Sequence, residues 1–403
     1  MSRFIAAAGL TAVFLGVLFA VLFTRPGVSA EPAARNSAPA PVKLSSTLPA
    51  WVAPGVRVAI SGFAGAHQIV RARLGGRNIA VVRSGRLGGF RLAVTAPPPG
   101  RYAVSVRSNG VVARVGTLLV RPVVLDAVGD VTTGEEVGAS VSTLGSNYPW
   151  TQVGATLRAA DIATANLEGA VSTRGVPVAN KEFHFRGSPA LLRSAHDAGG
   201  LDVVTVANNH SGDYGSVALL DTIRYAHAAG LETVGGGIDA AAALRPAIVE
   251  AGGLRIGFVG LSDVNPYGFN ATVDTPGTAK ADPDTVTAAV RAARRQADVV
   301  VCWFHWGTEL HPVPSERQQQ LAAAALNAGA QVVLGAHPHV FGAVTSPTRH
   351  SVVAWTLGNF VFPANSAGTT RTGILMVALD RHGVRGWRVE RATIHGFRPQ
   401  LDR

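Results

Sequence analysis

The stretch QVVLGAHPHV, residues 331–340, combines a short apolar run with two histidines spaced two residues apart. The apolar run predicts a buried strand, and the glycine and proline predict a stiff turn directly after it. The carboxyl ends of parallel strands border a crevice, so His337 and His339 are placed where two imidazoles can bind one cation. A pair of histidines with this spacing also occurs in surface loops, so this stretch alone leaves a metal site and a plain surface pair both open.

The same pattern recurs along the chain. Apolar runs that end in metal-compatible side chains occur at LDAVGD (residues 125–130), ATANLEG (163–169), VVTVANNH (203–210) and VVVCWFHWG (299–307). Chance explains one such coincidence better than it explains five. The repetition favours a shared metal site at one edge of a sheet.

The polar residues that follow these runs supply both oxygen and nitrogen donors. The expected metal ligands are Asp130, Glu168, Asn209, His305, His337 and His339. A carboxylate can bridge two cations, and this mixture of donors favours Mn, Fe, Zn or Mg over Ca. His210 is expected to act as an acid, a base or a charge stabiliser. The residues expected to orient these groups are Asn208, Asp213 and Glu309. For the acids and Asn208, a turn or capping role is the alternative.

Charge is distributed unevenly along the 403 residues, of which 47% are hydrophobic and which carry a net charge of +11. Residues 51–121 contain eleven Arg and no Lys, Asp or Glu, whereas residues 122–403 carry 21 basic and 24 acidic residues. The positive charge is therefore local. The length predicts two domains and additional segments. The single cysteine, Cys302, lies in an apolar run, so no intrachain disulfide can form and a small buried side chain is expected.

The N-terminal region predicts export. Residues 4–23 contain no charged side chain and lie between Arg3 and Arg25, and their number matches a helix that crosses a bilayer. We expect residues 1–30 to be a transmembrane signal anchor or, with cleavage after Ala30, a signal peptide. Residues 31–50, rich in Ala, Pro and Ser, are expected to form a flexible linker. Either alternative predicts extracytoplasmic domains, held at the cell membrane in the first case and secreted in the second.

Residues 51–121 are expected to form a small Ig-like β-sandwich. Short alternating runs such as IVRARL, residues 69–74, recur between Gly and Pro turns. In that run the alternation is interpreted as placing Arg71 and Arg73 on one face and Ile69 with the core on the other. The cationic face is either a platform for an anionic polymer or lipid, or the decoration of an inert spacer. Nucleic acid is not an expected partner, because no aromatic residues alternate with the arginines to stack bases.

Residues 122–403 show apolar β-branched runs that alternate with Ala-rich segments. This alternation is typical of an α/β domain whose sheet is covered on both faces. The predicted helices cover residues 148–160, 189–198, 215–229, 284–296 and 315–328. Glycines after Ala-rich segments mark several of their ends. The polar residues of interest come just after the predicted strands, as a site at one edge of a sheet requires.

Six motifs follow one another in this part of the chain: VGD, NLEG, ANNHSGDYG, HWGTEL, GAHPHV and TLGNFVF. In this order they resemble the poly-γ-glutamate capsule synthesis family (CapA), whose domain is similar to the calcineurin-like metallophosphoesterases. The resemblance covers residues 123–398 and implies a four-layer α/β/β/α sandwich, here preceded by the small β-sandwich and the N-terminal transmembrane segment. By this resemblance, Asp130 matches the opening aspartate of the family and Glu168 matches the bridging acid. Asn209 with His210 matches the Asn-His motif. His305 matches the lone histidine, and His337 with His339 matches the closing pair.

Two positions depart from the family pattern. Metallophosphoesterases have a ligand histidine two residues after the opening aspartate, where this chain has Thr132. The resemblance therefore implies one tightly bound cation and one that is weakly bound or absent. The ligands of the first are Glu168, Asn209, His305 and His337. The ligands of the second are Asp130, Glu168 and His339. The capsule family commonly has GHHPHV, and here Ala336 replaces the first histidine. The metal-binding pair is retained, whereas a supporting contact or proton donor is lost.

Three functions are compatible with this reading. The first is an extracytoplasmic component of the synthesis or export of poly-γ-glutamate or another anionic wall polymer, with capsule synthase or export subunits as partners. The second is a metal-dependent hydrolase of a phosphoester or a polymer amide, in which His210 stabilises charge or protonates the leaving group. The third is a polymer-binding scaffold without turnover. A phosphoesterase-like fold alone does not decide among them.

Overall fold

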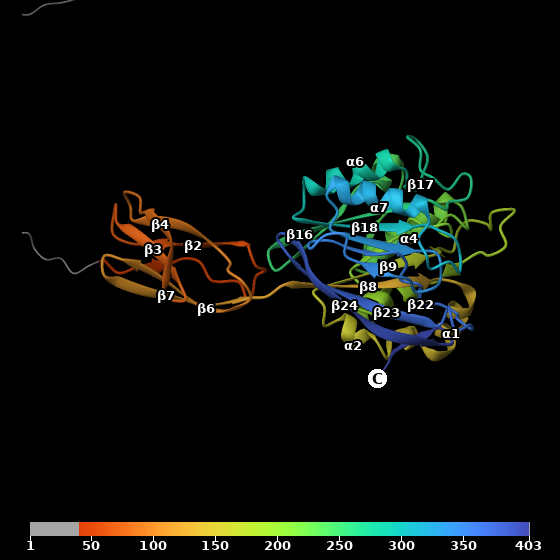
Figure 1. Cartoon of the computed structure of the whole chain (residues 1–403), viewed down its shortest axis with the longest axis horizontal. Helices are drawn as coiled ribbons and strands as arrows, with labels where there is room; N and C mark the ends of the chain where they lie inside the picture. The colour runs from red at the N-terminus through yellow and green to blue at the C-terminus, as the bar shows by residue number, and fades with distance from the viewer. Residues whose placement is uncertain (1–39, 403) are drawn as a thin grey trace, which may run out of the picture. The chain divides into compact units, whose positions relative to one another are not determined.

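The computed structural model describes residues 40–402 (Figure 1). The expected anchor or signal peptide, residues 1–30, and residues 31–39 of the expected linker lie outside the described residues. The rest of the expected flexible linker is described, and within it Lys43–Leu44 pair with a strand of the following domain. Within residues 40–402, no helix is both long enough and apolar enough to cross a membrane. The transmembrane segment at residues 4–23 stays a prediction.

Residues 43–120 form two antiparallel sheets, with strand orders β1-β2-β5 and β4-β3-β6-β7. Their strands are β1 (Lys43–Leu44), β2 (Arg57–Phe63), β3 (Ile69–Leu74), β4 (Arg77–Arg83), β5 (Gly89–Thr95), β6 (Gly100–Ser108) and β7 (Val111–Val120). Side chains from both sheets form one apolar core, which includes Ile60, Leu92, Val70 and Val106. The two sheets are therefore the layers of a β-sandwich.

Strand β3 shows how the alternation divides the faces of this sandwich. Val70 and Leu74 are buried, whereas Arg71 is exposed. The assignment of Ile69 to the core face is wrong, because Ile69 has the same parity as Arg71 and is 40% exposed. The cationic face therefore also carries apolar side chains.

The rest of the chain contains two larger sheets. The first has strand order β13-β12-β9-β8-β23-β24-β25, with β22 beside β8. Its strands are β8 (Val123–Thr132), β9 (Ile162–Glu168), β12 (Val203–Thr205), β13 (Glu232–Val234), β22 (Asn359–Val361), β23 (Arg371–Asp380), β24 (Gly383–His395) and β25 (Arg398–Leu401). Strands β8, β9, β12 and β13 run parallel to their neighbours in this set. Their carboxyl ends consequently lie along one edge of the sheet.

The second large sheet has strand order β15-β16-β18-β19-β21-β20, and β16, β18, β19 and β21 are parallel. Its strands are β15 (Ala247–Ala251), β16 (Leu254–Ser262), β18 (Val299–His305), β19 (Val332–Ala336), β20 (Val344–Thr345) and β21 (Val352–Ala354). Two short pairs, β10 (Ala170–Val171) with β11 (Arg186–Gly187) and β14 (Gly236–Gly237) with β17 (Gly277–Thr278), lie outside these sheets.

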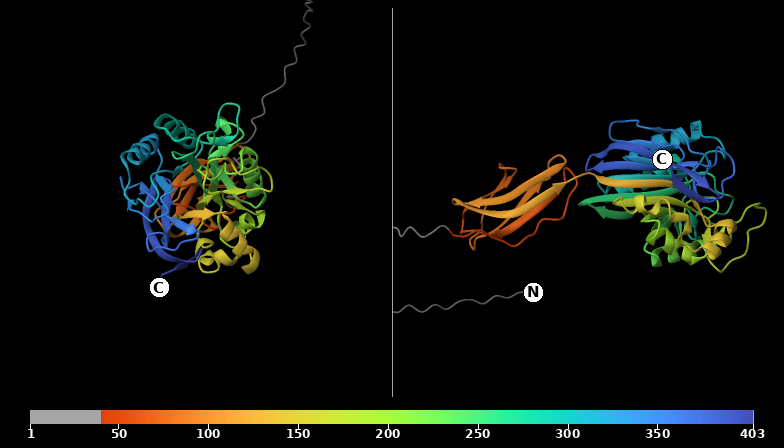
Figure 2. Two further views of the ribbon diagram at one scale, coloured as in Figure 1. Left: turned by 90° about the vertical axis from the view of Figure 1, so that its right-hand side faces the viewer. Right: turned by 90° about the horizontal axis from the view of Figure 1, so that it is seen from below.

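Figures 1 and 2 show the sheets and helices of these layers, and three apolar cores hold the layers together. The first lies between the two large sheets and contains Leu125 and Trp303. The second joins the first sheet to α1 (Glu135–Leu144), α2 (Gly154–Leu157), α3 (Pro189–Asp197) and α4 (Ser216–Ala228). The third joins the second sheet to α5 (Ala240–Ala243), α6 (Pro283–Arg294) and α7 (Glu316–Ala328). This is the expected four-layer α/β/β/α sandwich.

The predicted helices agree with the structure at α3, α4, α6 and α7. The predicted helix at residues 148–160 is wrong, because this segment contains the 3-10 turn η1 (Tyr148–Trp150) and the short α2. Trp150 is buried there, and its Nε1 donates to Ser194 Oγ at 3.1 Å. A Cβ on Gly154 would lie 2.1 Å from the Ala198 carbonyl oxygen. Close packing against α3 therefore decides this segment.

Candidate metal centre

Polar side chains from both large sheets meet at the edge where their parallel strands end. Glu168 ends β9, Asn209 follows β12, His305 ends β18 and His337 follows β19. His305 Nε2 lies 2.8 Å from Asn209 Oδ1, and the rings of His305 and His337 are 4.8 Å apart. Residues that are far apart in the sequence are thus brought within reach of one cation.

Asn166, in the middle of this group, connects the two sheets. Its Nδ2 donates to Asp130 Oδ1 at 2.9 Å and lies 3.3 Å from both Glu168 Oε2 and His305 Nδ1. Its Oδ1 accepts from Asn208 Nδ2 at 3.0 Å. Asn166 is fully buried, so these contacts satisfy an amide that water cannot reach.

Asn208 shapes the turn that carries the Asn-His pair. Its Nδ2 also donates to the carbonyl oxygen of Leu167 at 2.8 Å. Its Oδ1 accepts from the backbone N–H of His210 at 3.1 Å and from Ser211 Oγ at 2.9 Å. The supporting role predicted for Asn208 fits these contacts, because its amide is fully used within the protein.

The closing histidine pair lies on a strained turn. His337 and His339 have φ values of 95° and 58°, in the left-handed region that residues other than glycine rarely adopt. The carbonyl oxygen of Pro338, between them, accepts from the backbone N–H of Leu310 at 2.8 Å. His339 Nδ1 lies 2.8 Å from Asn359 Oδ1. The turn is thus held by its neighbours in the conformation that presents both rings.

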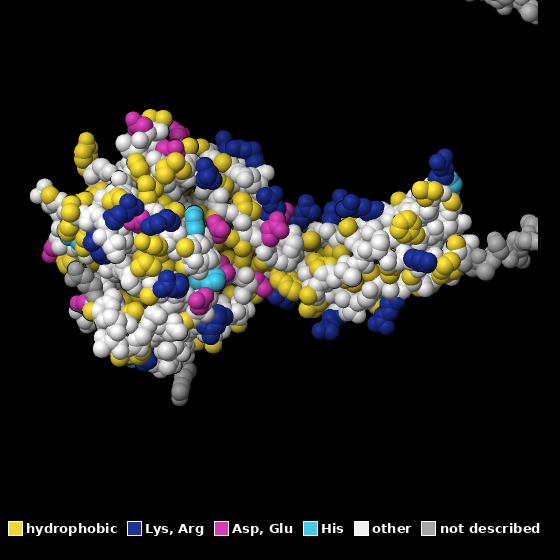
Figure 3. Space-filling model, turned by 180° about the vertical axis from the view of Figure 1, so that it is seen from behind, with side chains coloured by type: hydrophobic (Ala, Val, Ile, Leu, Met, Phe, Trp, Pro, Cys, Tyr) yellow, Lys and Arg dark blue, Asp and Glu magenta, His cyan; other side chains and the backbone are white. Residues whose placement is uncertain are grey.

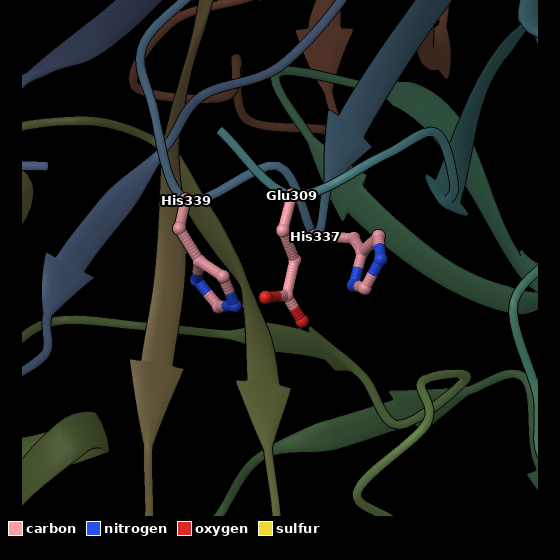
Figure 4. Close-up of side chains that lie close together, drawn as sticks. All are labelled: Glu309, His337 and His339. Carbon is pink, nitrogen blue, oxygen red and sulfur yellow. The ribbon is translucent and has the colours of Figure 1, made fainter. Parts of the chain in front are cut away.

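Among the histidines and acids of the centre, two groups of donor atoms lie close together, and one of them includes Glu309. Donor atoms that lie within 4.8 Å of one another belong, within the described residues, to the groups Asp130, Glu168 and His305, and Glu309, His337 and His339. Figure 4 shows the Glu309 carboxylate between the two imidazoles. Glu309, predicted to be a supporting residue, therefore lies where it can bind a cation itself.

Thr132 has a structural task at this edge. Its Oγ1 accepts from the backbone N–H of Gly134 at 2.9 Å, where α1 begins. A hydroxyl in this arrangement offers no nitrogen to a cation. That one cation position is poorer in ligands than the other stays a prediction.

Unpartnered atoms show that these residues fit a divalent cation. Glu168 Oε1 and His337 Nδ1 are buried and have no hydrogen-bond partner. Glu168 Oε1 lies 3.8 Å from His339 Nε2 and 3.9 Å from His210 Nε2. These separations are too long for hydrogen bonds. Buried polar atoms without partners are costly, and a cation that binds the carboxylate and the imidazoles would satisfy them.

A family profile described as "Bacterial capsule synthesis protein PGA_cap" matches residues 124–364. The chain belongs to this family. The matched residues include every predicted ligand of the metal centre. They do not include the β-sandwich of residues 43–120.

Curated relatives of this PGA_cap protein have matching names. It is 31% identical over 274 residues to the "PGA biosynthesis protein CapA" of Bacillus subtilis (strain 168), covering 68% of this chain and 72% of that one. It is 32% identical over 252 residues to the "Capsule biosynthesis protein CapA" of Bacillus anthracis, covering 61% of this chain and 60% of that one. These names place the relatives in capsule polymer synthesis.

The likeness to solved structures is weaker. A 5'-nucleotidase precursor from Thermus thermophilus has a TM-score of 0.40 and 17% identity, covering 70% of this chain and 55% of that one. A likeness at this level carries no argument about the PGA_cap protein.

The protonation of the histidines differs across the centre. Burial lowers the pKa of His305 far below its usual value, and burial together with His339 lowers the pKa of His337 to about 4. For His339, burial opposes the charged form, but Glu168 and Asp130 outweigh it and raise the pKa to about 10. His305 and His337 are thus neutral and able to bind a cation, whereas His339 must first release a proton.

The two buried acids of the PGA_cap centre repel each other. Burial, followed by the charge of Asp130, raises the pKa of Glu168 well above its usual value. The backbone N–H of His337 lies 3.4 Å from Asp130 Oδ2, and His339 Nδ1 lies 3.4 Å from the same oxygen. A positive charge in this space therefore stabilises both carboxylates.

His210 is fixed from three directions. Its ring stacks on Phe185 with a centroid distance of 3.9 Å and an interplanar angle of 15°. Its Nδ1 lies 2.8 Å from Asp213 Oδ2 and 3.0 Å from Lys181 Nζ, and Lys181 pairs with Asp213. Burial lowers the pKa of His210, so the ring is neutral at neutral pH. The Nδ1 atom of His210 therefore already has partners, whereas its Nε2 atom faces Glu168.

A cavity of about 620 Å³ opens beside these residues. Its lining includes the metal-centre residues His210, Glu309 and His339 and the aromatic rings of Phe183, Phe185, Tyr214 and Phe362. The acidic side chains that line it, among the described residues, are those of Glu136, Glu182 and Glu309. The cavity thus has aromatic walls, carboxylates and the open side of His210.

Four residues of the PGA_cap centre were not predicted: Asn166, Lys181, Phe185 and Asn359. Asn166 could have been found, because Thr164, Asn166 and Glu168 alternate on one face of an otherwise apolar strand. Asn359 lies inside the TLGNFVF motif. Lys181 and Phe185 lie outside the helices and longer strands, where periodicity gives no signal.

Proposed function

We propose that this protein is an extracytoplasmic component of capsule polymer assembly or export whose metal centre hydrolyses a phosphoester or an amide of the polymer. Membership of the PGA_cap family and the names of the relatives support the polymer process. One observation carries the hydrolase: the buried, unpartnered Glu168 Oε1 lies among imidazoles beside a cavity that His210 also lines.

The chain's own residues would share the work of hydrolysis. A divalent cation, Mn, Fe, Zn or Mg, when bound, supplies the Lewis acidity that cleavage of such bonds needs. The predicted ligands, Asp130, Glu168, Asn209, His305, His337 and His339, would hold it. His210 would present Nε2 to the substrate; in the tautomer in which Nδ1 accepts from Lys181, the ring proton is on Nε2 and can stabilise charge or pass to the leaving group. Asp213 and Lys181 keep the ring in position through Nδ1.

The partners follow from the sequence and the family. The segment at residues 4–23 would hold the protein in the membrane as a single-pass anchor, or release it if the signal is cleaved. Poly-γ-glutamate or a related anionic wall polymer is the proposed substrate or cargo, and capsule synthase or export subunits are the proposed protein partners. The names of the relatives support the polymer in this set.

Substitution of His210 tests the hydrolase. In the full chain loaded with Mn²⁺, we expect His210→Ala to reduce turnover of a phosphodiester or of poly-γ-glutamate by about 10²–10⁴-fold, as loss of an acid–base group does. Metal content measured by plasma mass spectrometry should stay unchanged. His395→Ala, an exposed histidine at the end of β24, is the matched control. Equal turnover by His210→Ala and the control would refute this role.

A polymer-binding scaffold without turnover is the second candidate. The observation that favours it is Thr132, whose hydroxyl is used by the backbone at the start of α1 and leaves one cation position short of a ligand. In that case no substrate is turned over with any of the four metals, while polymer binding is retained and weakens with salt.

A further inference from the structure

The outer face of the sheet β4-β3-β6-β7 places like charges side by side. The register of β3 and β6 sets Arg71 directly opposite Arg107, and both are exposed. Side chains directly opposite each other on one face have Cβ atoms about 5 Å apart. Like charges in this position destabilise a sheet. Folding alone does not favour this pair.

Two more arginines extend the pair across the whole sheet. Arg71 lies opposite Val81 on β4, and Arg83 is two residues further along that strand. Arg107 lies opposite Val112 on β7, and Arg114 is two residues further along. Such diagonal neighbours are about 7–8 Å apart. We define the arginine stripe as this set of exposed side chains: Arg83, Arg71, Arg107 and Arg114.

The sandwich offers this stripe no negative charge. Residues 51–121 contain no Asp or Glu. Arg83 donates through Nη1 to the carbonyl oxygen of His67 at 3.0 Å, a contact that leaves its charge uncompensated. Figure 3 shows basic and hydrophobic side chains sharing the visible surface of this part of the molecule. The stripe is therefore a line of cations whose counter-charge must come from outside the sandwich.

The metal centre lacks what the stripe has. Within the described residues, the cavity is lined by three carboxylates, Glu136, Glu182 and Glu309, by the protonated ring of His339, whose pKa is raised to about 10, and by no Lys or Arg. The three carboxylates outnumber the protonated imidazole, so the lining of the cavity disfavours a polyanion at neutral pH. If the polymer of the proposed function is to stay with this protein, a cationic surface elsewhere must hold it.

We propose that the arginine stripe is a binding site for a linear polycarboxylate, poly-γ-glutamate in the setting of the function proposed above, on which this inference rests. Guanidinium groups bind carboxylates through two parallel hydrogen bonds. A polymer with one carboxylate in every repeat unit can meet successive arginines along the line. The four residues of the stripe run diagonally across the four strands, so successive carboxylates of one linear chain can reach them in turn.

Paired substitutions in the full chain test this site. Binding of fluorescently labelled poly-γ-glutamate is measured by polarisation at 50 and 300 mM NaCl. We expect R71Q/R107Q to weaken binding at least about tenfold and to reduce its salt dependence, because two charge-assisted contacts are lost. The matched control, R57Q/R91Q, removes the same charge from exposed positions of β2 and β5 in the other sheet. It should change binding less than about twofold, within the context dependence of a surface charge.

A charge-conserving variant separates geometry from charge. R71K/R107K should bind more weakly than the parent chain but more tightly than R71Q/R107Q, because lysine retains the charge and loses the paired hydrogen bonds. Equal weakening by R71Q/R107Q and R57Q/R91Q would overturn the proposal, since binding would then follow net charge alone. Tighter binding to vesicles with anionic phospholipid than to the polymer, lost in R71Q/R107Q, would also overturn it and assign the stripe to membranes.

The outcome can be told apart from failure of the proposed function. Hydrolysis of bis(p-nitrophenyl) phosphate by the Mn²⁺-loaded chain reports on the metal centre and should be the same in the parent chain and R71Q/R107Q. Absence of hydrolysis with polymer binding that depends on the stripe would refute the hydrolase and support the stripe. Hydrolysis together with polymer binding that is unchanged in R71Q/R107Q would support the hydrolase and refute the stripe as the binding site.

Discussion

The metal centre and the arginine stripe both gather polar groups, but they satisfy them differently. At the metal centre the groups are buried, and most are paired with one another, as Asn166 is with Asp130, Asn208 and His305. On the stripe the groups are exposed, and water can solvate them. A buried atom without a partner costs far more than an exposed one. Glu168 Oε1 is therefore the stronger indication of a missing ligand, whereas the evidence for binding at the stripe is the arrangement of its arginines.

The largest expected effect comes from Glu168. We expect Glu168→Gln to weaken Mn²⁺ binding by more than about a hundredfold, because even groups that only orient ligands cost 10–100-fold. The thermal midpoint of the metal-free protein should stay the same or rise, since the substitution removes the repulsion from Asp130. Calorimetric titration and thermal unfolding measure the two quantities.

Glu232, exposed at the start of β13, supplies the control for this experiment. Glu232→Gln should leave metal affinity and the thermal midpoint unchanged. If Glu168→Gln instead lowers the midpoint of the metal-free protein and keeps its affinity for Mn²⁺, Glu168 stabilises the fold and does not bind the ion.

Asp126 tests whether a buried carboxylate without partners always indicates a missing ligand. It lies on β8 with Asp130, is fully buried, and neither of its carboxylate oxygens has a hydrogen-bond partner. Burial raises its pKa to about 7, with Arg388 partly opposing the shift. The unfolded chain releases this proton near pH 4 and the folded chain near pH 7, so stability falls as the pH rises between these values.

We expect Asp126→Asn to stabilise the α/β domain at pH 8 by up to about 4 kcal/mol, which corresponds to a shift of roughly three pKa units, and to have little effect at pH 4. Chemical denaturation at the two pH values measures the difference. Asp274→Asn, an exposed loop position, is the control. Destabilisation by Asp126→Asn at pH 8 would mean that this carboxylate also has a ligand.

The pH dependence of metal binding sharpens the description of the centre. The pKa of His339 is raised to about 10 by Glu168 and Asp130, which outweigh burial, so the ring carries a proton at neutral pH. A cation that binds its nitrogen must displace that proton. We expect the apparent affinity for Mn²⁺ to rise by about tenfold per pH unit between pH 6 and 9. An affinity that does not change over this range would show that His339 keeps its proton and is not a ligand.

The smallest expected effect concerns the stripe. Arg107→Gln removes the charge directly opposite Arg71 and should stabilise the sandwich by about 0.5 kcal/mol at low salt. The gain should disappear at 1 M NaCl, where screening is nearly complete. Arg91→Gln, opposite Ser61 in the other sheet, should show no gain. Loss of stability in Arg107→Gln would mean that the arginine serves the fold itself.

Much of the fold could be predicted from local sequence. The apolar runs that end at Asp130, Glu168 and His305 are buried strands, and strand ends in a parallel sheet lie on one edge, so the convergence followed from their order. Helices α6 and α7 carry their own signals, since Asp282 and Ser315 cap their first turns.

The parts that could not be predicted depend on contacts between distant segments. Glu309 was expected to support the ligands, yet the turn at Pro338 brings its loop against His337 and His339. Lys181 and Phe185 reach His210 from a segment without periodicity. The segment at residues 148–160 bends because Trp150 packs against Ser194. Local propensity contains none of this information.

The ligand residues come from two sheets that otherwise touch mainly through an apolar interface. Within this interface, Trp303 Nε1 donates a hydrogen bond to the Thr164 hydroxyl at 2.9 Å. An ion bound by residues of both sheets would fasten them together at one end, where packing alone resists sliding poorly. Its binding energy would add to the energy of folding. A shortage of the ion would then shorten the lifetime of the protein as well as inactivate its site, and the amount of intact protein would follow the metal supply.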